Sequence, residues 1–149
     1  MNAAHLHLLL NHLPIGTLLF GFGILVVGWI QRSEPVLRVA LDILILGGLV
    51  AAAAFLTGNP AADVLRKYPS YEEKLVHEHW LAANFGLWST VITAVAAAGC
   101  LYLSMRRGTV PRCCLIILLV INLWALSVIA RTNYLGGLIG HPEIRSESK

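Results

Sequence analysis

Four long stretches that are almost free of charged side chains constrain this chain more than any other feature. They cover residues 12–30, 39–57, 80–103 and 113–130, and the single charged side chain among them is Asp42. Each stretch is long enough to cross the roughly 30 Å hydrocarbon core of a bilayer as a helix. We therefore predict an all-α integral membrane protein, an up-down-up-down four-helix bundle that forms one domain over residues 1–149.

The composition agrees with a lipid bilayer as the main partner of the chain. Hydrophobic residues make up 57% of the sequence and charged residues only 13%, whereas soluble domains carry about 25% charged residues. The mean hydropathy is +0.72. The isoelectric point near 9 comes from arginines in the loops, so we expect no nucleic-acid partner.

Charge in the loops predicts the orientation. The two short loops at 31–38 and 104–112 contain five arginines against one acid, Glu34. Because Lys and Arg are enriched in cytoplasmic loops, we expect these loops in the cytoplasm and both termini outside. In a bacterial inner membrane, the outer side faces the periplasm. All six histidines fall on that side: His5, His7, His12, His77, His79 and His141.

Local signals predict where the first two helices begin and end. Asn11 is placed to cap a first helix that has Pro14 in its first turn. The alternative is one helix from about Ala3 that kinks at Pro14. The second helix is expected to end at Gly58 and to be followed by a short interfacial helix at 61–68.

Similar signals apply to the second half of the chain. Ser70 and Glu73 form a capping-box pattern, which predicts that the third long helix begins near Tyr71. Residues 135–143 are too rich in glycine for a helix, so we expect this segment to fold back across the outer mouth of the bundle. His141 and Glu143 would then cap a site from above.

The histidines near the start of the chain are the first candidates for a site. Residues 5–14 hold three of the six histidines. Interfacial histidines often hydrogen-bond only to water or to lipid headgroups, but polar groups at the membrane are also frequent functional groups. His12 and His79 both lie at the start of a predicted span, on helices that are diagonal in a four-helix bundle.

Small residues beside these two histidines suggest room for a flat cofactor. His77 and His79 are two residues apart, so on a helix they point in nearly opposite directions. Gly86 belongs to a run of small residues below His79, and Gly16 and Gly23 lie below His12. Tight helix packing explains the same pattern. The first hypothesis is a small cytochrome that transfers electrons and binds haem b through His12 and His79, with Gly16, Gly23 and Gly86 beside the macrocycle.

Two alternatives remain open. Imidazoles and carboxylates together suit copper, zinc or non-haem iron. The candidate ligands are His5, His7, His12, His77, His79, His141, Glu78 and Glu143. The third hypothesis is an accessory subunit of a larger respiratory or photosynthetic complex, without a cofactor. Electron transfer or metal binding is favoured over a hydrolytic enzyme, and the first two hypotheses imply a redox partner.

Several motifs also resemble a known group of sequences. They are H-x-H-L-L-L-N-H-x-P at 5–14, T-G-x-P-A at 57–61, H-E at 77–78 and R-T-x-x-L-G-G-x-I-x-H-x-E at 131–143. Together they resemble a family of uncharacterised bacterial four-span membrane proteins, and a larger domain-of-unknown-function group whose first helix reads H-x-x-x-x-H-x-P. The resemblance covers the whole chain and implies a four-helix membrane fold with a histidine site, in some members with b-type haem.

Overall fold

Five helices make up the computed structural model, which describes residues 2–143 and 145. They are α1 (Ala3–Leu10), α2 (Leu13–Gln31), α3 (Glu34–Leu65), α4 (Glu73–Arg107) and α5 (Arg112–Gly140). Because α1 and α2 follow one another as a single span, the described part of the chain has four helical segments long and apolar enough to cross a membrane. The predicted all-α, four-span bundle is confirmed.

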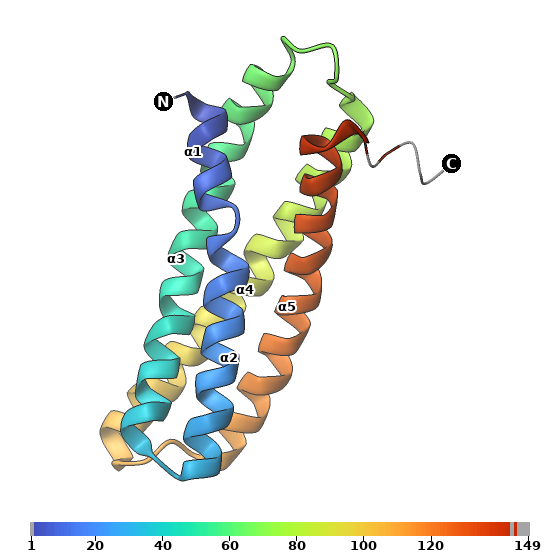
Figure 1. Cartoon of the computed structure of the whole chain (residues 1–149). Helices are drawn as coiled ribbons and strands as arrows, with labels where there is room; N and C mark the ends of the chain where they lie inside the picture. The colour runs from blue at the N-terminus through green and yellow to red at the C-terminus, as the bar shows by residue number, and fades with distance from the viewer. Residues whose placement is uncertain (1, 144, 146–149) are drawn as a thin grey trace.

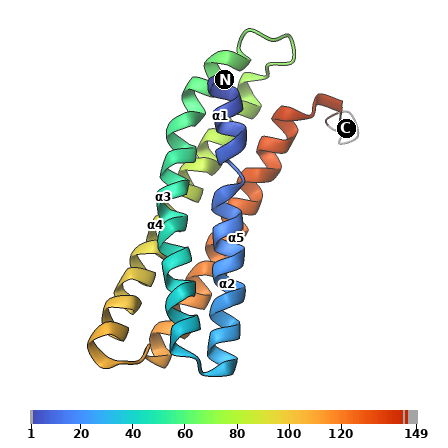
Figure 2. The same ribbon diagram turned by 60° about the vertical axis from the view of Figure 1, so that its left-hand side comes forward.

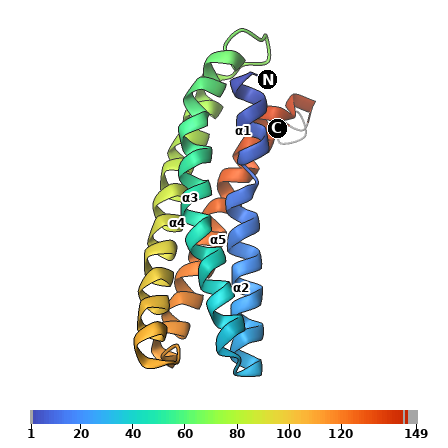
Figure 3. The ribbon, with the colours of Figure 1, turned by 90° about the vertical axis from the view of Figure 1, so that its left-hand side faces the viewer.

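The four long segments run alternately up and down, and both chain ends lie at the same end of the bundle (Figure 1). α3 packs against α2 and α4, and α5 packs against α4 and α2. α2 and α4 therefore occupy opposite corners, as the views in Figures 2 and 3 also show. α1 packs mainly on the neighbouring part of α3. Side chains from the α1–α2 span and from α4 can thus face each other across the bundle.

Leucines and small residues hold the helices together. Leu18, Leu25, Leu41, Leu44 and Leu118 are completely buried. Glycines bring the helix backbones close together: a Cβ added to Gly48 of α3 would lie 2.7 Å from Cβ of Ala94 of α4. Lipid tails are as apolar as leucine, so close packing of small residues is a main source of helix association in membranes. Large apolar side chains such as Phe20 and Leu56 are exposed, where they would contact lipid.

The first span is broken rather than continuous. α1 ends at Leu10, and α2 begins at Leu13 with Pro14 in its first turn. The sequence allowed a helix with Pro14 in its first turn or one kinked helix from about Ala3. The first of these is closer to the structure. The predicted cap was wrong, because Asn11 is the C-cap of α1 and His12 holds the N-cap position of α2.

Two expected helix ends were also wrong. α3 continues through Gly58 and Pro60 to Leu65, so the separate helix expected at 61–68 does not exist. One missing backbone hydrogen bond at a proline is tolerated when packing supports the helix, and α1 packs on α3. α5 likewise continues to Gly140 through the glycine-rich segment, where Gly136 packs against the ring of His79.

The start of α4 lies two residues later than expected. α4 begins at Glu73, with Glu72 at the N-cap position, so the Ser70 capping box was wrong. The carbonyl of Ser70 instead accepts a hydrogen bond of 3.2 Å from Arg145 Nη1. Arg145 Nε also donates to the carbonyl of Leu138 at 2.6 Å. Arg145 thereby links the end of α5 to the loop before α4.

Candidate functional site

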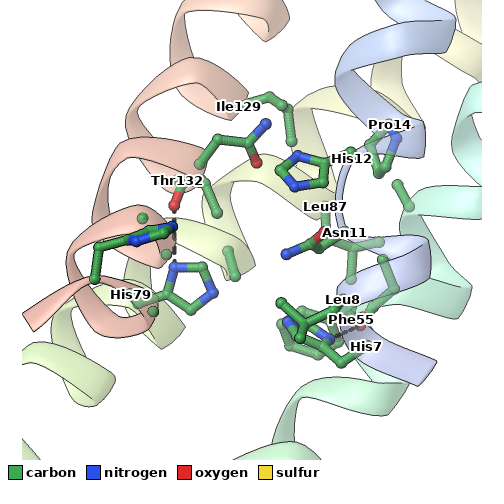
Figure 4. A pocket seen from close by; sticks show the side chains of 18 residues that line it. His7, Leu8, Asn11, His12, Pro14, Phe55, His79, Leu87, Ile129 and Thr132 are labelled. Carbon is green, nitrogen blue, oxygen red and sulfur yellow. Dashed lines mark hydrogen bonds between the residues drawn. The ribbon is translucent and has the colours of Figure 1, made fainter. Parts of the chain in front are cut away.

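A partly open cavity of about 190 Å³ lies near the end of the bundle that carries both termini (Figure 4). Side chains from α1, α2, α3, α4 and α5 line it. Its walls include the apolar side chains of Leu8, Phe55, Leu87 and Ile129. Four histidines also line it: His7, His12, His79 and His141. Histidines spread along the sequence are thus gathered around one cavity.

The ring of His7 is held on the wall of α3. Its Nδ1 lies 3.1 Å from the carbonyl oxygen of Ala54 and 3.0 Å from Oγ1 of Thr57. The Thr57 hydroxyl donates its own hydrogen to the Ala54 carbonyl at 2.7 Å, so it accepts from His7. Because both partners are acceptors, Nδ1 of His7 carries the proton. In the neutral ring, Nε2 is therefore left with a free lone pair.

The ring of His79 is held in the same way on α5. Its Nδ1 lies 3.0 Å from the carbonyl oxygen of Thr132, which only accepts, so Nδ1 again carries the proton. Gly136 provides the space for this ring, because a Cβ at that position would lie 3.1 Å from Cε1 of His79. A glycine that looked like a helix breaker in the sequence thus allows a close approach between α5 and the imidazole.

His7 and His79 face each other across the cavity. Their ring centroids are 6.5 Å apart and their planes are at 87°. Figure 4 shows the two rings on opposite sides of the cavity, with the Nδ1 bond of His79 directed toward Thr132. A histidine that binds metal through one ring nitrogen normally donates its other N–H to a carbonyl, carboxylate or water. Both rings have this arrangement before any ligand is considered.

Asn11 and His12 form a second polar group in the cavity. Both side chains come from the break between α1 and α2 and point into the cavity in Figure 4. Oδ1 of Asn11 is buried and has no hydrogen-bond partner among the described residues. Buried side-chain oxygens are normally paired, so this unpaired oxygen is an unusual feature beside the cavity.

His141 and Glu143 form an exposed pair just beyond α5. Nδ1 of His141 lies 2.9 Å from Oε1 of Glu143. The backbone N–H of Glu143 and the hydrogen bond from His141 hold the pKa of the Glu143 carboxyl below its usual value. His141 also lines the cavity, so the pair provides a polar group at its edge.

Three of the predicted metal ligands lie away from the His7–His79 pair. His5 is exposed, and its Nδ1 is 2.8 Å from Oδ1 of Asn2. His77 is exposed and stacks on Trp80 with ring centroids 6.3 Å apart. Glu78 forms an exposed ion pair of 4.0 Å with Lys74. Within the part of the chain that the structure describes, no three His, Cys, Asp or Glu side chains are grouped as a ready metal site.

The three glycines expected beside a macrocycle have different surroundings. A Cβ on Gly86 would lie 2.8 Å from Cδ1 of Ile129, so Gly86 provides close contact between α4 and α5. At Gly16 and Gly23, a Cβ would meet no heavy atom of the described chain within 4 Å. Their proposed contact with a cofactor stays a prediction.

Sequence reasoning did not identify the residues that orient the two facing rings. It paired His79 with His12 and counted His7 only among possible metal ligands. One available signal was spacing, since His7 and Asn11 are four residues apart and so share a helix face. Thr57, within the T-G-x-P-A motif, was a second signal. The partner of His79 on α5, Thr132, likewise belongs to a quoted motif, R-T-x-x-L-G-G-x-I-x-H-x-E at 131–143.

Comparisons with protein-family models, with curated proteins and with solved structures found no match for this chain.

Proposed function

We propose that this protein is a small membrane electron-transfer protein that holds a haem b, or another redox-active metal centre, between His7 and His79. The observation that carries this proposal is the geometry of the two rings. Each donates Nδ1–H to a backbone carbonyl and keeps Nε2 free, and their centroids are 6.5 Å apart. This pair replaces the His12–His79 pair as the proposed ligand set.

The separation of the rings supports one metal held by both imidazoles. Metal–nitrogen bonds to imidazole are about 2.0–2.1 Å long. Two imidazoles that both bound one metal would have ring centroids no more than roughly 6.5 Å apart. The 6.5 Å separation of the His7 and His79 centroids is compatible with that limit.

The surroundings also fit a haem. Leu8, Phe55 and Leu87 line the same cavity as the two rings and would provide apolar contacts. A bound iron would supply one-electron chemistry. His7 and His79 would hold it, and Thr57 and Thr132 fix the orientation of the two rings. The cavity is partly open, so a macrocycle is not confined to its enclosed volume.

A copper, zinc or iron ion without a macrocycle is the second candidate, and a different observation favours it. The cavity measures about 190 Å³, which is below the roughly 300–1,000 Å³ typical of sites for organic ligands. His12 and His141 line the same cavity as His7 and His79. Rotation of these side chains could complete a multi-histidine site, for which imidazole is a suitable ligand.

The position of the site suggests where its redox partner approaches. The cavity lies near the end of the bundle with both termini, and the arginine-rich loops lie at the other end. By the positive-inside tendency, the site would face the periplasm of a bacterial inner membrane. A redox protein or a larger membrane complex on that side would exchange electrons with it.

Purified protein in detergent tests the proposal through its visible absorption and metal content. We expect a bound haem, or close to one equivalent of metal, in the wild type and at least a tenfold lower content in His79→Ala. His77→Ala is the matched control, because His77 is exposed and stacked on Trp80, and it should retain the cofactor. A haem spectrum favours the first candidate, and metal without that spectrum favours the second. Equal cofactor content in wild type and His79→Ala, after reconstitution with haem and with each metal, would contradict both.

A further inference from the structure

The last two turns of α5 form one wall of the cavity from a sequence that does not favour a helix. Gly136, Gly137 and Gly140 all line the cavity, and all three lie within α5, which ends at Gly140. Glycine is among the least favourable residues in a helix, because it loses the most backbone freedom there. Contacts with the rest of the molecule must therefore keep these turns, residues 135–140, helical.

Arg145 provides such contacts at the end of the helix. Its Nε donates to the carbonyl of Leu138 at 2.6 Å, and its Nη2 donates to the carbonyl of Ile139 at 2.9 Å. The last four carbonyls of a helix have no N–H partner within the helix, and Pro142, four residues after Leu138, has no N–H to donate. The guanidinium of Arg145 thus takes the place of missing backbone donors.

The same guanidinium connects these turns to another part of the bundle. Its Nη1 donates to the carbonyl of Ser70 at 3.2 Å and to Oε2 of Glu72 at 3.4 Å, and both residues lie between α3 and α4. The side chain of Glu72 is 55% exposed, and exposed ion pairs contribute little to stability. This connection can therefore break and re-form at low cost, as the lids of binding sites require.

The inner side of these turns covers the candidate ligand His79. A Cβ at Gly136 would lie 3.1 Å from Cε1 of His79, so the helical turns pack closely on the imidazole. Thr132, whose carbonyl orients the ring, lies before these turns in the sequence. Unwinding of residues 135–140 would therefore uncover His79 without removing the group that orients it.

We propose that residues 135–140 are a gate of the cavity and that Arg145 is the latch that keeps this gate closed. With the latch in place, the turns are helical and cover His79. When the guanidinium leaves the carbonyls of α5, the glycine-rich turns unwind and the cavity opens toward the end of the bundle that carries both termini. The inference rests on the proposed function only for what passes through the gate, a haem or a metal ion on its way to His7 and His79.

Hydrogen–deuterium exchange of residues 135–140 tests the latch, with cofactor-free protein in lipid nanodiscs. Exchange of these amides follows the population of the open state. Loss of hydrogen bonds from a charged donor corresponds to roughly a tenfold change in an equilibrium, so we expect about tenfold faster exchange in Arg145→Ala. Arg131→Ala is the matched control, because Arg131 is an exposed residue of α5 that does not line the cavity, and its exchange should equal that of the wild type.

Gly137→Ala should act in the opposite direction. A Cβ at this position would meet no atom of the described chain within 4 Å, and alanine favours a helix more than glycine does. When Gly137→Ala is added to Arg145→Ala, the exchange of residues 135–140 should slow by roughly fivefold.

Thiol labelling shows whether unwinding opens the cavity. The background variant has the three native cysteines replaced by alanine. Ala51 lines the cavity and is 4% exposed, so Ala51→Cys should react slowly with a small water-soluble methanethiosulfonate, and about tenfold faster when Arg145→Ala is added. Ala97→Cys is the control for loosening of the whole bundle, because Ala97 is completely buried and does not line the cavity. Its labelling should not change.

Three results would overturn the proposal. The first is equal exchange in Arg145→Ala and wild type, and the second is faster exchange without faster labelling of Ala51→Cys. The third is an equal rise in labelling of Ala51→Cys and Ala97→Cys, which would show that Arg145 stabilises the whole bundle. None of these measurements depends on a cofactor. A gate that opens as expected in a protein that holds no haem or metal after reconstitution therefore contradicts only the proposed function.

Discussion

The imidazoles of His7 and His79 face each other from α1 and α4, with their ring centroids 6.5 Å apart and their planes at 87°. Each ring is oriented by a carbonyl of another helix, Ala54 of α3 for His7 and Thr132 of α5 for His79. Four helices therefore contribute to one pair of side chains. The arrangement exists only in the assembled bundle, and it predicts how substitutions around it should act.

His7 and His12 of the first span should differ in their effect on a bound cofactor. His7→Ala removes one of the two facing rings, so we expect at least a tenfold loss of haem or metal in the purified protein. His12→Ala leaves both facing rings in place and should cost less than threefold. Metal analysis and absorption spectra of the two variants check this. A larger loss of haem or metal in His12→Ala than in His7→Ala would favour His12 and His79 as the ligand pair.

A methyl group at Gly136 should disturb the site without unfolding the protein. In Gly136→Ala the new Cβ would lie 3.1 Å from Cε1 of His79, so the ring must move by a few tenths of an ångström, and we expect this shift to strain its bond to Thr132. Changes in the groups that orient a metal-bound histidine typically cost about 10- to 100-fold in metal affinity, and we expect a loss in this range.

Gly99→Ala on α4 is the control for that substitution. Its Cβ would meet no atom of the described chain within 4 Å, and Gly99 does not line the cavity. Titration with the bound metal or haem should give the wild-type affinity for Gly99→Ala. The same affinity for both variants would show that the ring of His79 has no part in binding.

Close packing of α3 on α4 should be sensitive to one added methyl group. In Gly48→Ala the two Cβ atoms of residues 48 and 94 would lie 2.7 Å apart, which forces the helices to separate. Overpacking of this kind costs about 1–3 kcal/mol, so the unfolding temperature in detergent should fall. Gly23→Ala is the control, since its Cβ would have no neighbour within 4 Å in the described structure. Circular dichroism during heating compares them, and equal stability of both variants would contradict the close contact.

The orientation in the membrane can be tested by labelling introduced cysteines in intact cells. The background variant has the native residues Cys100, Cys113 and Cys114 replaced by alanine. A reagent that cannot cross the membrane should label Ser70→Cys, which lies between α3 and α4, and should not label Ser33→Cys, which lies between α2 and α3. The physical reason is the concentration of arginine at the end that carries Ser33. Labelling of Ser33→Cys alone would put the histidine cavity on the cytoplasmic side.

The sequence was sufficient for the architecture because lipid leaves few choices. A stretch such as 113–130, without a charged side chain, must satisfy its backbone hydrogen bonds internally, and a helix does this locally. Four such stretches require that both termini lie at one end, and the positions of the histidines in the sequence then place them at that same end. These conclusions depend on composition and length alone, and none requires knowledge of a contact between helices.

Contacts between helices determined the helix ends and the histidine pairing that composition did not predict. Gly58, Pro60 and Gly136 are local signals for a helix end, yet α3 and α5 continue through them. α1 packs on α3, and Gly136 makes room for the ring of His79. Tertiary contacts also determined that His7, and not only His12, faces the cavity with His79. A side chain finds its partner through the packing of helices distant in sequence, and the spacing of residues along one helix does not contain that information.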